Sequence, residues 1–206
     1  PISVAYAAND VLLNYSNTTN EKQKKYLNIV REQLNHLSGL VEQILTLSVE
    51  NRSTFRLRPE TIQVAELLTP LIEQFKLKTD KPIDITTEIP EDMTVTADRT
   101  HLFNILSNLV ENSVKYAGDT IEVRASALID DRYVTVTVGD NGCGISRDDL
   151  PHIFKRFYRG RASAAGQPGM GIGLAYVRLL VGAHGGDITA ESRENEGTNF
   201  IIRLPR

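Results

Sequence analysis

The stretch Gly169–Leu174 reads Gly-Met-Gly-Ile-Gly-Leu, and a helical pattern from Ala175 to Val181 follows it at once. Glycines let the backbone approach a ligand closely, and a helix start offers unpaired amides and partial positive charge to phosphate oxygens. The stretch is neither a Walker loop, because no Gly-Lys-Ser/Thr follows, nor a Rossmann turn, because no strand leads directly into it. Many helices simply begin after a flexible loop, so a phosphate site is predicted only if other segments support it.

A strand is predicted upstream, where Tyr133–Asp140 alternates valines on one face with threonines on the other. The Asn-Gly pair that follows Asp140 is typical of a hairpin turn. However, Ser146–Asp149 reads as a capping box, and apolar residues recur at helical spacing over Leu150–Phe157, so we expect a helix there instead of a second strand. A carboxylate at a strand end beside glycines suits an amino group such as that of adenine, which makes Asp140 the specificity candidate.

A third segment, Asp98–Val114, is predicted to be a helix with leucines along one side. Its other side carries polar residues: Asn104, Asn108, Asn112, Lys115 and Tyr116. Such a stripe can be plain solvated surface. Alternatively, Asn112 supplies a hard oxygen ligand to Mg²⁺, with Asn108 one turn back, Lys115 beside the phosphates and Tyr116 over the base or sugar.

Taken together, these segments resemble the sensor histidine kinases, which share an ATPase superfamily with gyrase, Hsp90 and MutL. The resemblance is carried, in this order, by the N-box Asn108–Tyr116, the G1 box Asp140–Gly144, the segment Ile153–Arg159, the G2 box Gly169–Leu174 and the closing Gly197–Phe200. No single segment is decisive, but the ordered set is highly specific.

The resemblance implies that the chain binds ATP and Mg²⁺, with Asn112 on the metal and Asp140 on the adenine amino group. It implies that Arg156 or Arg159 reaches the phosphates and that a mobile lid covers Gly160–Gly169, where small residues offer little to anchor a fold. The residues it assigns to nucleotide binding are Asn108, Asn112, Lys115, Tyr116, Asp140, Gly142, Gly144, Ile145, Arg156, Arg159, Gly169, Gly171, Ile172, Gly173, Leu174 and Thr198.

This chain differs from the hydrolysing members of that superfamily at one position, and the difference indicates the type of reaction. Its hydrolysing members place a glutamate four residues before the magnesium asparagine, where this chain has Asn108. Glu111 is adjacent to Asn112 and is turned about 100° away along a helix. Transfer to a protein side chain therefore fits better than hydrolysis, and Glu111 is the one catalytic candidate. Hydrolysis, transfer to serine, and a non-catalytic dimer scaffold that senses ATP remain as alternatives.

Residues 1–50 are predicted to form a helical hairpin, with a break at Asn17–Asn20 and a capping box at Thr18 and Glu21. Apolar residues then recur at spacings typical of a coiled-coil seam: Leu27, Val30, Leu34, Leu37, Val41 and Ile44. A second copy would cover this seam in a four-helix bundle, so we expect a homodimer, although packing against the rest of the same chain is an alternative.

In the histidine kinases such a hairpin is the dimerisation and phosphoacceptor domain. Pro1-Ile2-Ser3 resembles the tail of the H-box His-Glu-Leu-Arg-Thr-Pro. That alignment puts the phosphoaccepting histidine upstream of Pro1, so this chain is expected to bind nucleotide without phosphorylating itself, while the family's partner is a response-regulator receiver domain. Packing or solvated roles are expected for the chain's own histidines: His36, His101, His152 and His184.

The 206 residues are 41% hydrophobic and 24% charged, enough for a sizeable core. We predict an α+β chain, with the hairpin over 1–50 and a two-layer α/β sandwich over 51–206, divided near Asn51–Ser53. The predicted strands are Phe55–Leu57, Ile83–Thr87, Met93–Ala97, Ile121–Leu128, Tyr133–Asp140, Asp187–Ser192 and Asn199–Leu204.

A net charge of −3 without a basic cluster argues against nucleic acid as a partner. The single cysteine, Cys143, fits a reducing compartment and is interpreted as a small filler in its turn. No apolar run approaches membrane-spanning length, so we expect no membrane contact and a cytoplasmic location. The family often carries sensor and transmembrane parts upstream.

Overall fold

The computed structural model describes residues 56–78, 81–160 and 170–206 and, before them, positions 5, 7, 9, 11, 23, 25–31, 33, 34, 37, 39 and 41. The chain divides into two compact units, Pro1–Val49 and Glu50–Arg206. No helix among the described residues combines the length and the apolarity needed to cross a membrane.

In the first unit, every described position is helical. Three members of the predicted seam are solvent-exposed within the chain: Leu27 is 57% exposed, Leu34 53% and Val41 48%. Asn17–Asn20 and Ile44 lie outside the described residues, so the hairpin break and the end of the seam stay predictions.

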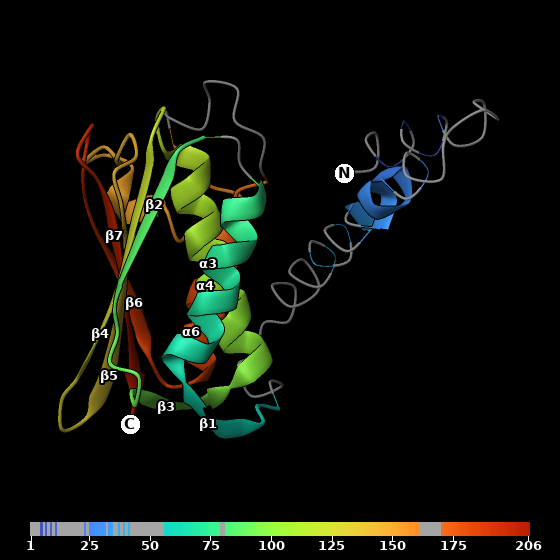
Figure 1. The fold of residues 1–206 in the computed structure, drawn as a ribbon. Coiled ribbons are helices and arrows are strands. Elements are labelled where there is room, and N and C mark those ends of the chain that lie inside the picture. Colours follow the sequence, from blue (N-terminus) through green and yellow to red (C-terminus); the bar gives the residue numbers. More distant parts are fainter. Residues whose placement is uncertain are drawn as a thin grey trace. The chain divides into compact units, whose positions relative to one another are not determined.

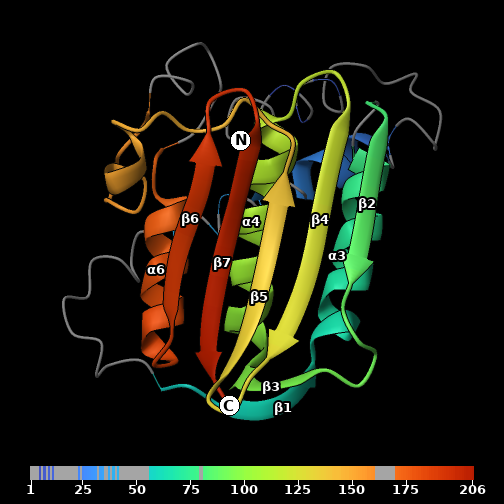
Figure 2. The ribbon, with the colours of Figure 1, turned by 90° about the vertical axis from the view of Figure 1, so that its left-hand side faces the viewer.

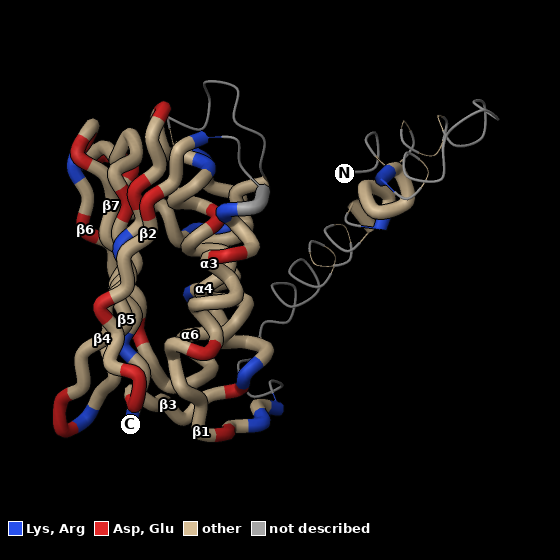
Figure 3. The backbone as a smooth tube through the Cα atoms, in the orientation of Figure 1, with Lys and Arg blue, Asp and Glu red and all other residues tan. Residues whose placement is uncertain are grey.

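The second unit is a two-layer α/β sandwich, as predicted (Figure 1). Its sheet has the strand order β2-β4-β5-β7-β6, with β2 parallel to β4 and all other neighbours antiparallel. The strands are β2 (Ile83–Glu88), β4 (Ile121–Ile129), β5 (Tyr133–Asp140), β6 (Asp187–Arg193) and β7 (Gly197–Pro205). Figure 2 shows the helices behind the sheet, so they cover one face, and within the described residues the other face carries no helix. Charges of both signs are distributed along the sheet (Figure 3).

The helices that cover the sheet are α3 (Val64–Lys78), α4 (Arg99–Tyr116) and α6 (Gly173–Ala183). Helix α4 begins after Asp98, whose side chain accepts a hydrogen bond from the backbone N–H of His101. Its leucines are buried, as its periodicity predicts, and they pack against the inward side chains of the strands. In β5 these are Val134, Val136 and Val138, each at most 1% exposed.

The predicted strand Phe55–Leu57 is wrong where it can be judged, because Arg56 and Leu57 are irregular and Phe55 lies outside the described residues. The strand there is β1 (Pro59–Gln63), which pairs antiparallel with β3 (Thr94–Asp98) in a separate sheet. Proline lacks a backbone N–H, so Pro59 is suited to the first position of a strand. Ile62 is fully buried and anchors the pair.

The predicted helix over Leu150–Phe157 is also wrong. Only a single 3-10 turn forms, η2 (Leu150–His152), although the Ser146 cap is present and its Oγ accepts the N–H of Asp149 at 3.1 Å. Pro151 interrupts helical hydrogen bonding, and Phe157 has a φ of 62°, which no right-handed helix allows.

Candidate functional site

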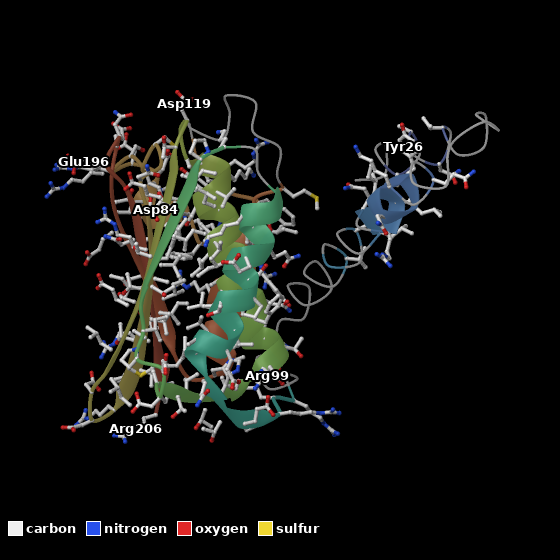
Figure 4. The ribbon with its side chains drawn as sticks, in the orientation of Figure 1. Tyr26, Asp84, Arg99, Asp119, Glu196 and Arg206 are labelled. Carbon is white, nitrogen blue, oxygen red and sulfur yellow. The ribbon has the colours of Figure 1, made fainter. Side chains whose placement is uncertain are left out.

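Several elements that are distant in sequence meet at one end of the second unit. β5 and β6 end there, and β7 and α6 begin there (Figure 2). Asp119, just beyond α4, and Glu196, in the β6–β7 turn, lie toward this end, whereas Arg99, the first residue of α4, lies at the other (Figure 4). The segments predicted to form the site are therefore brought to the same end of the sandwich.

Asp140 ends β5 and is held by backbone donors. Its Oδ1 accepts the N–H of Gly142 at 2.9 Å and the N–H of Thr198 at 3.2 Å. Burial raises the pKa of Asp140 above its ordinary value of 3.8, while these two bonds and a hydrogen bond with the Ser113 side chain act in the opposite direction. A carboxylate has about four acceptor positions, so this group can still accept from a ligand N–H.

Ser113 joins α4 to Asp140, and sequence reasoning gave it no role. Its side chain is completely buried, and its Oγ lies 3.1 Å from the carbonyl oxygen of Leu109 one turn earlier. The single hydrogen of this hydroxyl is shared between that carbonyl oxygen and the Asp140 carboxyl, whose pKa the contact lowers. The helix that carries the N-box therefore contacts the proposed specificity residue directly.

The G1 box packs closely against its neighbours. The N–H of Cys143 donates to the carbonyl oxygen of Tyr116 at 3.1 Å, and a Cβ at Gly142 would lie 2.8 Å from the same oxygen. Gly144 has a φ of 67°, and a Cβ there would overlap the carbonyl oxygen of Arg193. Both glycines are thus required by close backbone approach, in addition to any contact with a ligand.

Asn141 extends the pairing of β5 with β4, another role that sequence reasoning missed. Its Oδ1 accepts the N–H of Glu122 at 3.0 Å, and its Nδ2 donates to the carbonyl oxygen of Thr120 at 3.1 Å. The hairpin that Asn-Gly could have formed is not present, because residues 141–149 form no strand. The side chain instead fixes the backbone that connects Asp140 to Gly142.

The first half of the N-box contacts the start of α6. Asn108 Nδ2 donates to the carbonyl oxygen of Asn104 at 2.8 Å, and Asn104 Nδ2 lies 3.5 Å from the hydroxyl of the buried Tyr176. A Cβ at Gly173 would lie 2.9 Å from Asn108 Oδ1. The N-box and the G2 box are therefore adjacent, as the predicted site requires.

The second half of the N-box lies next to the G1 box. Asn112, Lys115 and Tyr116 are all half-buried, whereas Glu111 is exposed. The Lys115 Nζ is 5.1 Å from the centroid of the Tyr116 ring, so the cation lies against the aromatic side chain in the last turn of α4.

The segment after η2 packs on the G2 box. The N–H of Phe157 donates to the carbonyl oxygen of Gly171 at 2.8 Å, and the guanidinium carbon of Arg178 in α6 is 5.9 Å from the Phe154 ring centroid. Arg156 and Arg159 are exposed here. Ile172 is buried and Leu174 half-buried, whereas Gly169 and positions 161–168 of the predicted lid lie outside the described residues.

A hollow of about 620 Å³ opens at the same end of the sheet. Asp140 and Thr198 line it, but so do Glu122, Arg124 and Asn199, which alternate with buried residues of their strands and point away from the helices. Asn112 does not line it. This hollow therefore belongs to the rim and the uncovered face of the sheet, and it is distinct from the region between α4 and the G1 box.

Two of the histidines lie at the far end of the unit. His184 Nε2 accepts the N–H of Asp98 at 3.0 Å, and its Nδ1 donates to the carbonyl oxygen of Leu180 at 2.8 Å. The His101 ring is edge-on to it at 6.1 Å. Both ring nitrogens of His184 are used in joining α6 to the start of α4, which is a packing role. His36 lies outside the described residues.

Residues 97–206 match the family model of the histidine kinase-, DNA gyrase B-, and HSP90-like ATPases. The chain belongs to this family. The sensor histidine kinase WalK of Bacillus subtilis (strain 168) is 29% identical over 185 residues, which cover 88% of this chain and 30% of WalK. The chain thus spans less than a third of that relative. The resemblance to two-component sensor kinases is confirmed.

Solved structures of histidine kinases have the same fold. ThkA in complex with the response regulator protein TrrA superposes with a TM-score of 0.66 at 27% identity, over 98% of this chain and 57% of that one. Full-length ShkA in complex with AMPPNP superposes with a TM-score of 0.71 at 24% identity, over 100% of this chain and 46% of that one. At 24% identity, the similarity to ShkA shows the fold alone.

The contacts described above involve residues of the family motifs, but Ser113 and Asn141 had been given no individual roles. A buried serine next to the N-box asparagine could have been suspected from the helical period, because Ser113 follows Leu109 and Val110 on the apolar side of α4.

Proposed function

We propose that the second unit binds ATP together with Mg²⁺ and acts as the phosphotransferase domain of a two-component histidine kinase. The observation that carries this proposal is the buried Asp140 carboxyl, which is fixed by the N–H groups of Gly142 and Thr198 and retains acceptor capacity. The exocyclic amino group of adenine supplies the matching donor. A base with a carbonyl at the same position would place two acceptors in contact.

Mg²⁺ would be held by the Asn112 amide oxygen together with phosphate oxygens and waters. The described residues contain no group of three or more His, Cys, Asp or Glu side chains that could hold a metal ion. A hard-oxygen site completed by the nucleotide is consistent with that composition, because Mg²⁺ keeps several waters and favours phosphate ligands. When bound, the ion would neutralise charge on the phosphates, and Lys115 would add a second positive charge beside them.

The phosphate end of the nucleotide would lie at the start of α6. The helix begins at Gly173, and Gly171 has a φ of 69°, so the backbone amides are presented without side chains in the way. Arg156 and Arg159 extend from the neighbouring segment, which Phe157 joins to Gly171. Asn108 would help to hold this end through its contact with Gly173.

For the whole protein, we propose that the γ-phosphoryl group passes to a histidine that precedes Pro1 and then to an aspartate of a response regulator. ThkA, which shares the fold, has been solved with such a partner. The exposed Leu27, Leu34 and Val41 would be covered by a second copy in a four-helix bundle. These steps would take place in the cytoplasm.

Titration calorimetry of the 206-residue chain with ATP tests the nucleotide site. Binding that weakens strongly when Mg²⁺ is chelated supports it, and no heat at millimolar ATP contradicts it. Incubation of a longer form that includes the upstream histidine with γ-labelled ATP tests the transfer. An acid-labile, base-stable label on that form alone supports histidine transfer, whereas acid-stable label favours serine transfer and steady phosphate release without label favours hydrolysis.

A further inference from the structure

The hydroxyl of Ser192 contacts three groups at the end of β6. Its Oγ accepts the N–H of Ile145 at 2.8 Å, directly after the G1 box. It lies 2.7 Å from the carbonyl oxygen of Gly197 and 2.9 Å from Oγ1 of Thr198, the residue opposite it in β7. Ser192 thus joins the G1 box to the β6–β7 hairpin.

The hydrogen count of this cluster fixes the direction of each bond. A serine hydroxyl has one hydrogen and two lone pairs. A carbonyl oxygen cannot donate, so the Ser192 hydrogen goes to Gly197, and one lone pair accepts from Ile145. The contact with Thr198 must then use the second lone pair, which makes the Thr198 hydroxyl the donor.

Thr198 therefore has no hydrogen left for a ligand and can only accept. It is 6% exposed, and its own N–H donates to Asp140 Oδ1, so the hydroxyl and the carboxyl are held next to each other on paired strands. The Asp140 carboxylate is likewise an acceptor. Two neighbouring acceptors favour a ligand whose facing edge carries hydrogen-bond donors, which reach them either directly or through a water.

We infer that Ser192 is a positioning residue that keeps the Thr198 hydroxyl an acceptor and thereby favours purine nucleotides with an amino group at C6 over those with a carbonyl there. This inference rests on the proposed nucleotide site. Without Ser192, the Thr198 hydrogen is released and can turn toward a C6 carbonyl, so discrimination between the two bases should fall.

The test compares ATP with inosine triphosphate, which differs from ATP at C6 by a carbonyl and a ring N–H. Affinities of the 206-residue chain for both are measured by calorimetry with Mg²⁺. Ser192→Ala changes a single hydrogen-bonding group, the Thr198 hydroxyl, from an acceptor to a possible donor. It should therefore lower the ratio of ATP affinity to inosine triphosphate affinity by roughly 3–10-fold. Ser192→Thr, which keeps the hydroxyl, should restore the wild-type ratio. Ser126→Ala, which removes a hydroxyl from β4, is the matched control and should leave the ratio unchanged.

The ratio of the two affinities distinguishes this role from a merely structural one, because a structural defect would weaken the binding of both nucleotides alike. Ser192→Cys fills nearly the same space with a poor hydrogen-bonding group and serves if the alanine variant does not fold; it should show the same fall. A folded Ser192→Ala or Ser192→Cys variant with the wild-type ratio, or a wild type that binds ATP and inosine triphosphate equally, overturns the inference. A wild type that binds neither nucleotide overturns the proposed function itself.

Discussion

Asn108 lies against Gly173 so closely that a Cβ at Gly173 would come within 2.9 Å of Asn108 Oδ1. The asparagine cannot swing away freely, because its Nδ2 donates to the carbonyl oxygen of Asn104 at 2.8 Å. The start of α6 therefore lies against the N-box of α4 and leaves no room for a side chain at position 173.

Gly173→Ala should displace Asn108 and break its bond to Asn104, at a cost of roughly 0.5–1.5 kcal/mol of unfolding free energy. In an Asn108→Ser background the shorter side chain leaves room, so the same change should cost much less. Urea unfolding of the two single variants and the double variant forms a cycle that measures this coupling. Additive effects would show that the two residues are independent.

Gly144→Ala should destabilise the second unit strongly, because φ is 67° and the new Cβ would overlap the carbonyl oxygen of Arg193. A backbone clash at a left-handed position costs on the order of 2–4 kcal/mol. Gly118→Ala is the matched control, since a Cβ at Gly118 meets nothing within 4 Å. In thermal unfolding, the Gly144 variant should melt at a clearly lower temperature than the Gly118 variant. Equal melting temperatures would show that position 144 does not require glycine.

Asn141→Ala should weaken ATP binding without contacting the nucleotide, because the bonds to Glu122 and Thr120 that fix the G1 box are lost. We expect a fall in affinity of roughly 3–10-fold. Asn141→Asp keeps the acceptor for Glu122 but places a second acceptor against the carbonyl oxygen of Thr120, so it should weaken binding as well. If both variants bind ATP as the wild type does, Asn141 has no positioning role.

The raised pKa of Asp140 predicts a pH dependence of stability in the nucleotide-free protein. A carboxyl with a higher pKa in the folded state binds more protons there than in the unfolded chain, so its contribution to stability falls as pH rises from 3.8 through the folded value. ATP binding needs the ionised form and should show the opposite trend, weakening as pH falls through the same interval.

Unfolding free energies measured between about pH 4 and about pH 7 for wild type and Asp140→Asn isolate this contribution. The difference, wild type minus variant, should decline as pH increases, because the variant cannot ionise. A difference that is flat across the range would mean that burial does not perturb Asp140.

The regular elements were predictable because their periodicity is strong. The alternation in Tyr133–Asp140 and the leucine stripe of α4 each specify a buried face without knowledge of the partner. The helix expected over Leu150–Phe157 failed because the N–H of Phe157 bonds Gly171, a residue distant in sequence, and Pro151 weakens the local alternative. Tertiary contacts decided that segment.

The site residues divide in the same way. Asp140, Asn108 and the glycines were predicted from their motifs and stay predictions as ligand-binding residues, whereas the contacts of Ser113 and Ser192 depend on which atoms lie beside them. Ser192 meets Thr198 only because β6 and β7 pair in one register, and a shift by one residue would turn its hydroxyl to the opposite face.

The most direct measurement is calorimetric titration of wild type and Asp140→Asn with ATP and Mg²⁺, with Asp84→Asn on the sheet edge as the matched control (Figure 4). Loss of a charge-assisted hydrogen bond of roughly 1.5–3 kcal/mol should lower the affinity of the Asp140 variant by about 10- to 100-fold. The Asp84 variant should bind as the wild type does. Unchanged ATP affinity in a folded Asp140→Asn protein would mean that this carboxyl does not read the base.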